Sequence, residues 1–490
     1  MATAPRHADV IIVGAGLSGI GAAAHLQDRC PGKTFLILEA RDVLGGTWDL
    51  FRYPGVRSDS DMYTLGYAFK PWTDPKAIAD GLAILAYIAE TARERGLDKT
   101  IHFGHRVVAA RWSSAQGLWT LEAEHQGERL AFTCSVLDFC SGYYAYGEGH
   151  RPRWPGEGDY RGRFVHPQAW PDDLDYRGKR VVVIGSGATA VTLVPAMART
   201  AAHVTMLQRS PTYVFSRPAE DGIANALRRW LPSMVAYQLV RAKNIGIGAL
   251  FFTLSRRRPD GVRRWLIGEA AKALGPGVDV QKHFTPRYNP WDQRLCLVPD
   301  GDLFEALKAG TASVATDEIE TFTADGIRLV SGEHLQADIV VTATGLRMKV
   351  FDGVQLSVDG KAIDLPRHLV YKGMMLDGVP NLMLTFGYTN ASWTLKADLT
   401  SAFLCRLLAH MDREGLPVAT PRFDGPVDAQ PLFEFTSGYV QRAAADLPRQ
   451  GTRKPWRLYQ NYVLDWLMLR RGRLDDGALR FTRPEGAVSR

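Results

Sequence analysis

The stretch DVIIVGAGLSGIGAAAHL, residues 9–26, joins an apolar strand to an alanine-rich helix through a GxGxxG turn. The pattern falls on Gly14, Gly16 and Gly19. Glycine at these positions tightens the turn and lets the backbone approach a pyrophosphate at the helix N-terminus. A second apolar run, Phe35–Leu38, ends at Glu39, and an acid there accepts from a ribose hydroxyl. The stretch therefore predicts an α/β dinucleotide-binding unit.

A second copy of this arrangement begins at KRVVVIGSGATAVTLV, residues 179–194. Its strand 181–184 is followed by GxGxxA at Gly185, Gly187 and Ala190. Where the first copy has an acid, the second has Arg209 and Ser210. A carboxylate would repel a 2′-phosphate, whereas an arginine binds that dianion with a planar set of donors. We therefore expect FAD at the first turn and NADPH at the second. The alternative for Arg209 is a solvated surface charge.

The segments between these turns indicate an α/β fold of two Rossmann-like domains with a helical insertion in the NADPH domain. The run 136–144 is expected to lead out of the FAD domain. The strand that ends before Thr344 and Gly345 is expected to lead back. Apolar spacing predicts two or three helices after residue 211. The expected boundaries are 1–146 and 346–490 for the FAD domain, 147–211 and 290–345 for the NADPH domain, and 212–289 for the insertion.

Composition narrows the possible partners and the compartment. The net charge is +7, and no basic block is interleaved with aromatic residues, which disfavours nucleic-acid binding. The five cysteines form no CxxC pair, so we expect a reducing, cytoplasmic setting with no disulfide framework and no metal site. The same absence disfavours a disulfide reductase, which shares both turns.

The apolar run Asn244–Ser255 is too short to span a membrane and is expected to be a buried helix. Membrane-surface binding by the basic insertion helices is the alternative.

Two further motifs carry a family resemblance. YRGRFVHPQAW, residues 160–170, spaces Gly162, His166 and Trp170 four apart and is followed by Pro171. It resembles the FxGxxxHxxxWP pattern of type I Baeyer–Villiger monooxygenases, with Tyr160 in place of phenylalanine. GGTWDLFRYPGVRSD, which runs from residue 45 to Asp59, resembles the second pattern of that family. The likeness extends over nearly the whole chain and is closest to the ethionamide monooxygenase subgroup.

The resemblance implies roles for particular residues. Arg294 corresponds to the family's active-site arginine, and Asp59 to the acid that orients it. A plain interdomain salt bridge is the alternative, and Asp61 is a rival for the acid. His166 and Trp170 are implied to couple NADPH binding to domain closure. Cofactor contacts are also expected for Gly46, Thr47, Trp48, Asp59, Thr344 and Gly345. Gln293 stands where many relatives carry a lysine that contacts the NADPH phosphate.

The implied activity is oxygen insertion that consumes NADPH and O2 and proceeds through a C4a-peroxyflavin. Ketones would give esters or lactones, and sulfides or thioamides could also be oxygenated. One alternative is an N- or S-oxygenating flavin monooxygenase without ketone activity. Another is a non-catalytic flavin redox sensor. The sequence leaves the physiological substrate and the oligomeric state open.

Two C-terminal segments carry helix predictions. Asn390 or Ser392 is expected to cap a long helix whose N-terminus could face the flavin. The run 455–474 is expected to form an amphipathic helix, with Trp466 and Leu469 packed into the core.

Overall fold

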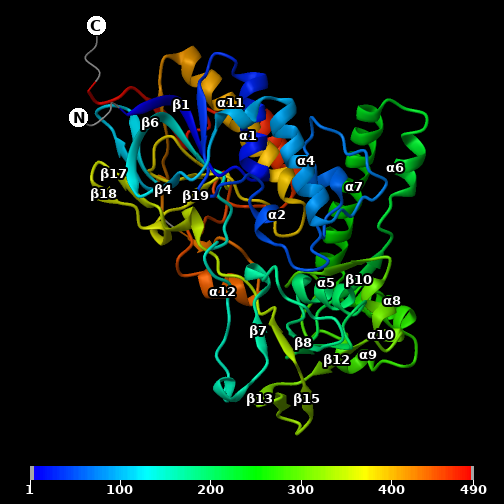
Figure 1. Cartoon of the computed structure of the whole chain (residues 1–490). Helices are drawn as coiled ribbons and strands as arrows, with labels where there is room; N and C mark the ends of the chain where they lie inside the picture. The colour runs from blue at the N-terminus through cyan, green and yellow to red at the C-terminus, as the bar shows by residue number, and fades with distance from the viewer. Residues whose placement is uncertain (1–4, 427, 487–490) are drawn as a thin grey trace.

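The computed structural model describes residues 5–426 and 428–486, which fold around two main β-sheets (Figure 1). The first sheet is built on β1 (Arg6–Val13), which runs parallel to β2 (Phe35–Leu38) and to β6 (Glu128–Phe139). Its other strands are β3 (Ile101–His102), β4 (Arg106–Ser113), β5 (Leu118–His125), β17 (Gln355–Val358), β18 (Lys361–Ala362) and β21 (Leu382–Leu384). The residues of β1 that follow Asp9 are buried, as expected for a parallel strand covered on both faces.

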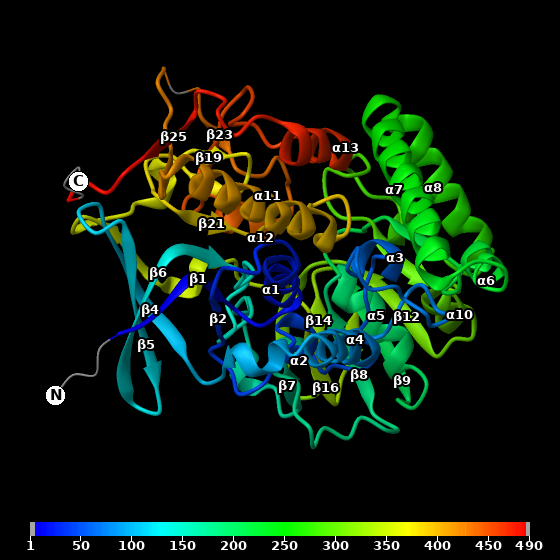
Figure 2. The same ribbon diagram turned by 90° about the horizontal axis from the view of Figure 1, so that it is seen from above.

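Helices from the two ends of the chain cover this first sheet together. α1 (Leu17–Arg29) packs against α11 (Trp393–Glu414), and the two share one hydrophobic core with β1 (Figure 2). α4 (Gly81–Glu94) also packs on α1, and the short helices α2 (Thr47–Leu50) and α3 (Met62–Leu65) lie in the loops before α4. The first and last parts of the chain thus build one domain.

The second sheet is parallel throughout, with the order β12-β9-β8-β16-β7. Its strands are β7 (Arg163–Val165), β8 (Arg180–Ile184), β9 (His203–Gln208), β12 (Ala312–Thr316) and β16 (Ile339–Thr342). α5 (Ala188–Met197) follows the GxGxxA turn and packs with α10 (Asp302–Lys308). A small antiparallel sheet lies beside it, made of β13 (Ile319–Thr323), β14 (Gly326–Leu329) and β15 (His334–Gln336). The α/β prediction with two Rossmann-like units is confirmed.

The insertion is mainly helical, as predicted, but it begins with a strand. β10 (Val214–Arg217) pairs in parallel with β11 (Cys296–Pro299), which lies on the far side of the insertion in sequence. The helices are α6 (Gly222–Leu227), α7 (Ser233–Arg257), α8 (Pro259–Leu274) and α9 (Val280–His283). α7 and α8 lie side by side at one edge of the molecule (Figure 2).

The run Asn244–Ser255 lies in α7, but the prediction that it is buried is wrong. Ile247, Leu250 and Leu254 are all exposed, and only Ser255 among the twelve residues is buried. The helix packs through its other face, so the aliphatic residues are left in solvent. Across residues 5–426 and 428–486, no helix combines the length and apolarity needed to cross a membrane.

Two C-terminal predictions need correction. The run 455–474 forms only α13 (Tyr462–Trp466) and one π-helical turn, 467–471, rather than a single amphipathic helix. Leu469 is fully buried, and Trp466 packs against the core, as expected. Ser392 precedes α11 but does not cap it through its side chain, because its hydroxyl bonds Thr64 Oγ1 at 2.6 Å.

The remaining short elements lie in both halves of the chain. They are β19 (Val370–Tyr371), β20 (Met375–Leu376), β22 (Val418–Pro421), β23 (Gln430–Pro431), α12 (Gly438–Ala443), β24 (Arg449–Gln450) and β25 (Leu479–Thr482), with 3-10 turns η1 (Leu97–Thr100), η2 (Glu157–Asp159), η3 (Pro167–Ala169), η4 (Val350–Gly353) and η5 (Leu365–Arg367).

Candidate functional site

The first glycine turn is held tightly between β1 and the end of β6. Gly14 has φ +107°, and a Cβ there would lie 2.8 Å from the carbonyl oxygen of Cys140. Ala15 donates its backbone N–H to Glu39 Oε2 at 2.7 Å, and Arg41 donates its own to Oε1 at 2.9 Å. Burial raises the pKa of Glu39. The acid at the end of β2 therefore lies directly beside the turn, as the motif predicts.

The second turn repeats this geometry in the other sheet. Gly185 has φ +142°, and a Cβ there would lie 2.4 Å from the carbonyl oxygen of Ala343, just after β16. Ser186 donates its hydroxyl to the Ser210 carbonyl at 3.1 Å, which ties the turn to the end of β9. Arg209 is exposed there. In contrast to Glu39, Arg209 extends into solvent at the mouth of the turn.

A cavity extends from the first turn to the start of α5, the helix that follows the second turn. Its lining includes the first turn, Glu39, the segment 45–48, the start of α5, Arg294 and residues near the start of α11. Gly46, Thr47 and Trp48 therefore lie at the cavity, as predicted for cofactor contacts. The start of α11 also reaches it through Ala391 and Trp393.

The segment that follows α2 crosses from the first domain to the second. Tyr53 is buried in the core of the second domain, where burial raises the pKa of its hydroxyl to about 12. A Cβ on Gly55 would lie 2.7 Å from Ala196 on α5, so this contact requires glycine. Arg57 binds Asp302 on α10 through both guanidinium ends, at 2.5 and 3.2 Å. The segment thus places Asp59 beside the second domain.

Asp59 contacts Arg294 across the domain boundary. Arg294 Nη1 donates to Asp59 Oδ2 at 3.0 Å, and both side chains line the cavity. The Asp59 charge raises the pKa of Arg294 well above its ordinary value. About 35% of the arginine side chain and 34% of the aspartate side chain are accessible to solvent. Asp61, the rival in sequence, instead caps α3 by accepting from Thr64 N and also bonds Asn244 at 2.9 Å.

Three tyrosines lie near enough to Arg294 to influence its charge, and sequence reasoning missed them. Tyr143 and Tyr144 lie at the end of the run 136–144, which leads out of the FAD domain. Their rings pack edge to face, with centroids 4.5 Å apart. The ring centroid of Tyr439, on α12, lies 6.3 Å from that of Tyr144. Burial raises the pKa of all three hydroxyls, to about 12 in the case of Tyr144. They therefore stay neutral and offer hydroxyl groups near the guanidinium. The only signal in the sequence was the pair Tyr143 and Tyr144 shortly after β6, the strand that leads out of the FAD domain.

The two linkers between the domains pair with each other. Lys349 N donates to Tyr143 O at 2.8 Å, Ala145 N to Arg347 O at 2.9 Å, and His150 N to Gly345 O at 3.0 Å. Thr344 Oγ1 donates to the His150 carbonyl at 2.6 Å. Thr344 and Gly345 therefore lie in a two-stranded hinge.

His166 and Gln168 both contact the linker 143–150. The His166 ring lies so close to Gly149 that a Cβ there would be 1.9 Å from the ring. Gln168 Nε2 donates to the carbonyls of Ala145 and Tyr146 at 2.8 and 3.0 Å. Burial lowers the pKa of His166, and its Nε2 atom is buried without a hydrogen-bond partner in the described chain. The histidine is therefore neutral, with one ring nitrogen free.

Trp170 and Tyr160 occupy the ends of the same motif. Trp170 packs on the core of the second domain, beside the α5 layer. Tyr160 donates its hydroxyl to the Ala337 carbonyl at 3.1 Å, and a Cβ on Gly162 would lie 2.2 Å from that hydroxyl. The extra oxygen of Tyr160, relative to phenylalanine, is thus accommodated by Gly162 and satisfied.

Comparison with known proteins identifies the family. Residues 73–241 match the flavin-binding monooxygenase-like family, and residues 12–72 match the NAD(P)-binding Rossmann-like domain. The FAD-containing monooxygenase EthA of Mycobacterium tuberculosis is 55% identical over 485 residues, with 99% of each chain covered. EthA of Mycolicibacterium smegmatis is 54% identical, also with 99% of each chain covered. The chain belongs to the type I Baeyer–Villiger family of flavoprotein monooxygenases, in the group that contains EthA.

Solved structures share the fold. An oxidized steroid monooxygenase bound to NADP has a TM-score of 0.74 at 20% identity, and 97% of this chain and 100% of that chain are covered. Cyclohexanone monooxygenase from Rhodococcus, bound to NADP+, has a TM-score of 0.70 at 19% identity, with 98% and 100% covered. The relatives make the protein a FAD-containing monooxygenase, and these structures show the fold that it shares.

The residues present fit both cofactors. At the first turn, the tight glycine backbone and the adjacent Glu39 carboxylate suit the pyrophosphate and ribose of FAD. At the second turn, the exposed Arg209 beside Ser210 suits the 2′-phosphate that distinguishes NADPH. The cavity runs from the first turn to the start of α5, the helix that follows the second turn.

Proposed function

We propose that this monooxygenase inserts one oxygen atom into ketones to give esters or lactones, and that it also oxygenates sulfides or thioamides. The observation that carries the proposal is the contact between Arg294 and Asp59 at the cavity, 3.0 Å apart. Such a cation beside the flavin site is what ketone attack requires, because that reaction develops negative charge on oxygen.

The flavin, once reduced by NADPH, supplies the activated oxygen. Arg294 stabilises negative charge near it and does not release its own proton, since a guanidinium stays protonated in proteins. Asp59 holds the guanidinium in place and balances its charge, which lowers the penalty for an enclosed cation. Removal of a positioned donor of this kind costs about 2.7–4 kcal/mol of barrier. The neutral hydroxyls of Tyr143 and Tyr144 complete the polar wall.

The NADPH side of the proposal rests on Arg209 and on the hinge. Arg209 and Ser210 bind the 2′-phosphate, which compensates for Gln293 in the place of a lysine. His166 and Trp170 couple cofactor binding to closure, since His166 lies against the paired linkers with Nε2 free. The domain boundaries at 146, 211, 289 and 345 are part of the same proposal, and the linker pairing at 143–150 with 345–349 supports the first and last of them.

Product analysis with labelled oxygen tests this function. FAD-loaded protein is incubated with NADPH, ¹⁸O-labelled dioxygen and either a cyclic ketone or a thioether. We expect a lactone and a sulfoxide that each gain one labelled oxygen. A sulfoxide without lactone assigns the protein to N- or S-oxygenation. NADPH oxidation that neither substrate changes, with no product, indicates a redox sensor and contradicts the proposal.

A further inference from the structure

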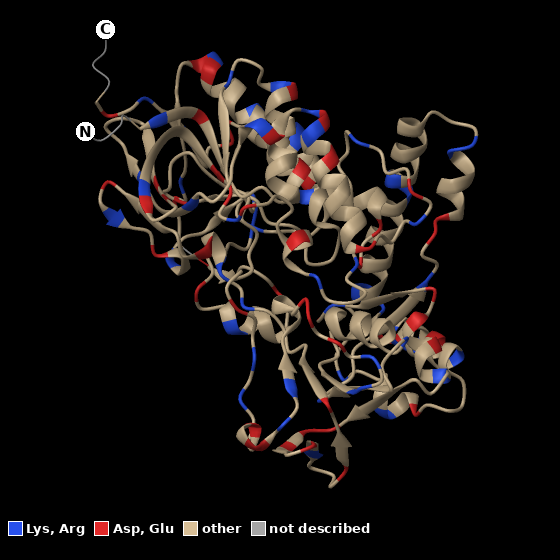
Figure 3. Cartoon of the chain, in the orientation of Figure 1, with Lys and Arg blue, Asp and Glu red and all other residues tan. Residues whose placement is uncertain are grey.

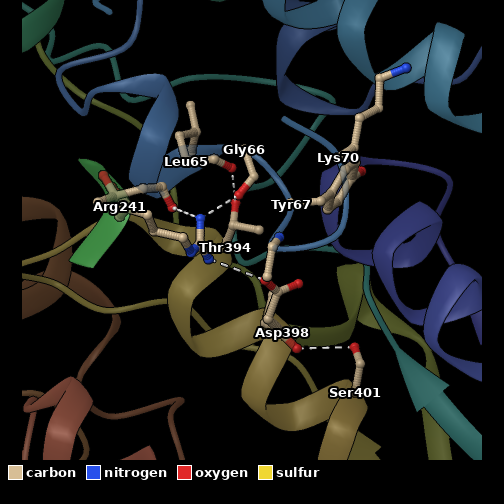
Figure 4. Close-up of polar contacts among 12 residues, drawn as sticks. Leu65, Gly66, Tyr67, Lys70, Arg241, Thr394, Asp398 and Ser401 are labelled. Atoms are coloured by element: carbon tan, nitrogen blue, oxygen red, sulfur yellow. Dashed lines mark hydrogen bonds and ion pairs between the residues drawn. The ribbon is translucent and has the colours of Figure 1, made fainter. Parts of the chain in front are cut away.

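The long insertion helix α7 packs through a face that carries a buried charge. Arg241 is 4% exposed, and its Nη1 atom donates to the carbonyls of Tyr63 and Gly66, each at 2.8 Å. Its Nη2 atom pairs with Asp398 on α11 at 3.2 Å, as Figure 4 shows. Three acceptors on the first domain therefore fix the rotation of α7 about its own axis.

The opposite face of α7 is aliphatic and lies in solvent. Residues spaced three or four apart share one side of a helix. Its exposed apolar residues follow this spacing and include Val235, Leu239, Ile247, Leu250 and Leu254, with Leu250 60% exposed. Trp230, in the turn before the helix, is 86% exposed. We call these six residues the apolar face. A soluble surface helix has the reverse arrangement, with its apolar side inward.

The charge around the apolar face has one sign. Residues 222–259 contain seven lysines and arginines and no aspartate or glutamate. Figure 3 shows the helices at the α6 and α7 positions as mostly uncharged, with basic residues near their ends. Arg241, Lys243 and Arg256 are paired with acids from other segments. No ion pair involves Arg229, Arg257 or Arg258 in residues 5–426 and 428–486, so these three are free to bind an external anion.

We propose that the apolar face docks onto an anionic lipid surface, with α7 lying in the plane of the headgroups. Aliphatic side chains enter the boundary between headgroups and acyl chains, and arginines at both ends bind lipid phosphates. Trp230 suits the same depth, because tryptophan concentrates at membrane–water interfaces. The buried contacts of Arg241 hold the helix in the orientation that presents this face.

A second copy of the chain fits this surface less well. A two-fold dimer brings the same patch of each subunit together. The free arginines at the two ends would then meet like charges, with no acid in residues 222–259 to balance them. An anionic bilayer offers both the apolar layer and the opposite charge.

Vesicle sedimentation tests the proposal on the full FAD-loaded chain. The protein is mixed with vesicles of phosphatidylcholine alone, or of phosphatidylcholine with phosphatidylglycerol. We expect binding to the anionic vesicles, weakened by added salt because screening reduces attraction between exposed charges. The double variant Leu239→Gln/Leu250→Gln should bind about tenfold more weakly or worse. Leu82→Gln, at a 75% exposed leucine on α4, should bind like the wild type.

A second pair of variants tests the charge requirement. Arg257→Gln/Arg258→Gln should weaken binding roughly tenfold at low salt. Arg177→Gln/Arg367→Gln removes the same net charge elsewhere and should have a much smaller effect. Without any variant, hydrogen exchange on the wild type should show residues 228–232 protected by anionic vesicles.

Three results overturn the proposal. One is no binding of the wild type to anionic vesicles, or equal binding to both vesicle types. Another is binding that the Leu239→Gln/Leu250→Gln variant retains. The third is a dimer in sedimentation velocity that the same variant dissociates, which would assign the apolar face to self-association.

Discussion

Arg294 and Asp59 are 235 positions apart in the chain and 3.0 Å apart in the fold. The aspartate is carried by a segment of the FAD domain that packs on α5, and the arginine by the turn before β11. Their contact therefore depends on how the two domains sit together.

The first prediction concerns the acid of this pair. Asp59→Asn should lower ketone oxygenation about tenfold to a hundredfold, because the guanidinium loses its charged anchor. NADPH oxidation should continue, with more of it ending as hydrogen peroxide, so both products are measured. Asp61→Asn is the matched control: its amide oxygen can still accept from Thr64 N and cap α3, so the variant should leave this product ratio unchanged.

A second prediction concerns the choice between NADPH and NADH. Arg209→Ala should reduce kcat/KM for NADPH by about tenfold to a hundredfold, since a charged hydrogen bond to the phosphate is worth about 1.5–3 kcal/mol. The value for NADH should hardly change, because NADH lacks that phosphate. Arg199→Ala, beyond the opposite end of α5, serves as the control. Equal losses with both cofactors would place Arg209 outside the phosphate site.

FAD retention should depend on the first glycine turn. Gly14→Ala places a Cβ 2.8 Å from the Cys140 carbonyl at φ +107°, a strain of about 1–3 kcal/mol. We expect purified variant protein with little bound flavin and a lower melting temperature, read from visible absorbance and thermal unfolding. Gly32→Ala, where a Cβ meets nothing within 4 Å, should keep its flavin. Full flavin content in Gly14→Ala would contradict the assignment of this turn.

Asp138 makes stability depend on pH. It is fully buried in β6, and burial raises its pKa to about 6 from the ordinary aspartate value of 3.8. The folded state therefore binds more protons than the unfolded state between these values, so this group's contribution to stability falls as pH rises through that window. Asp138→Asn replaces the titrating carboxyl with a neutral amide, so this loss of stability with rising pH no longer occurs. Its stability relative to the wild type should increase by about 2–3 kcal/mol between pH of about 4 and about 7.

Denaturant unfolding at several pH values measures this difference. Asp175→Asn, at an exposed carboxylate, provides a comparison. The stability difference between Asp138→Asn and wild type should change with pH in the stated direction. A difference that stays constant across the window would show that the buried carboxyl does not titrate there.

The sequence predicted the parts of the fold that are encoded locally. Both glycine turns, their strands and the acid or arginine at the end of the next strand are where the spacing placed them. Each depends on residues within about thirty positions, where steric demands at glycine and unbroken apolar runs leave few alternatives. The linkers were also found, because their buried strands end in recognisable turns.

Features that depend on assembly could not be predicted in this way. Tyr439, on α12, lies near enough to influence the charge of Arg294, and nothing in the local pattern of that short helix indicates it. Ser392 failed as a cap because Thr64, far away in sequence, binds its hydroxyl. The outward aliphatic side of α7 violates the usual rule that apolar residues turn inward, so the prediction of burial was wrong for a physical reason.

The central claim is that the charge of Arg294 is needed for oxygen insertion rather than for cofactor binding. The direct measurement compares Arg294→Ala and Arg294→Lys with wild type and with the distant control Arg367→Ala. It follows flavin reduction by NADPH and lactone formation from a cyclic ketone in the same samples. We predict that Arg294→Ala keeps its flavin and reduces it, yet loses at least about a hundredfold in lactone formation, with partial recovery in Arg294→Lys. Lactone formation at the wild-type rate by Arg294→Ala would contradict the account.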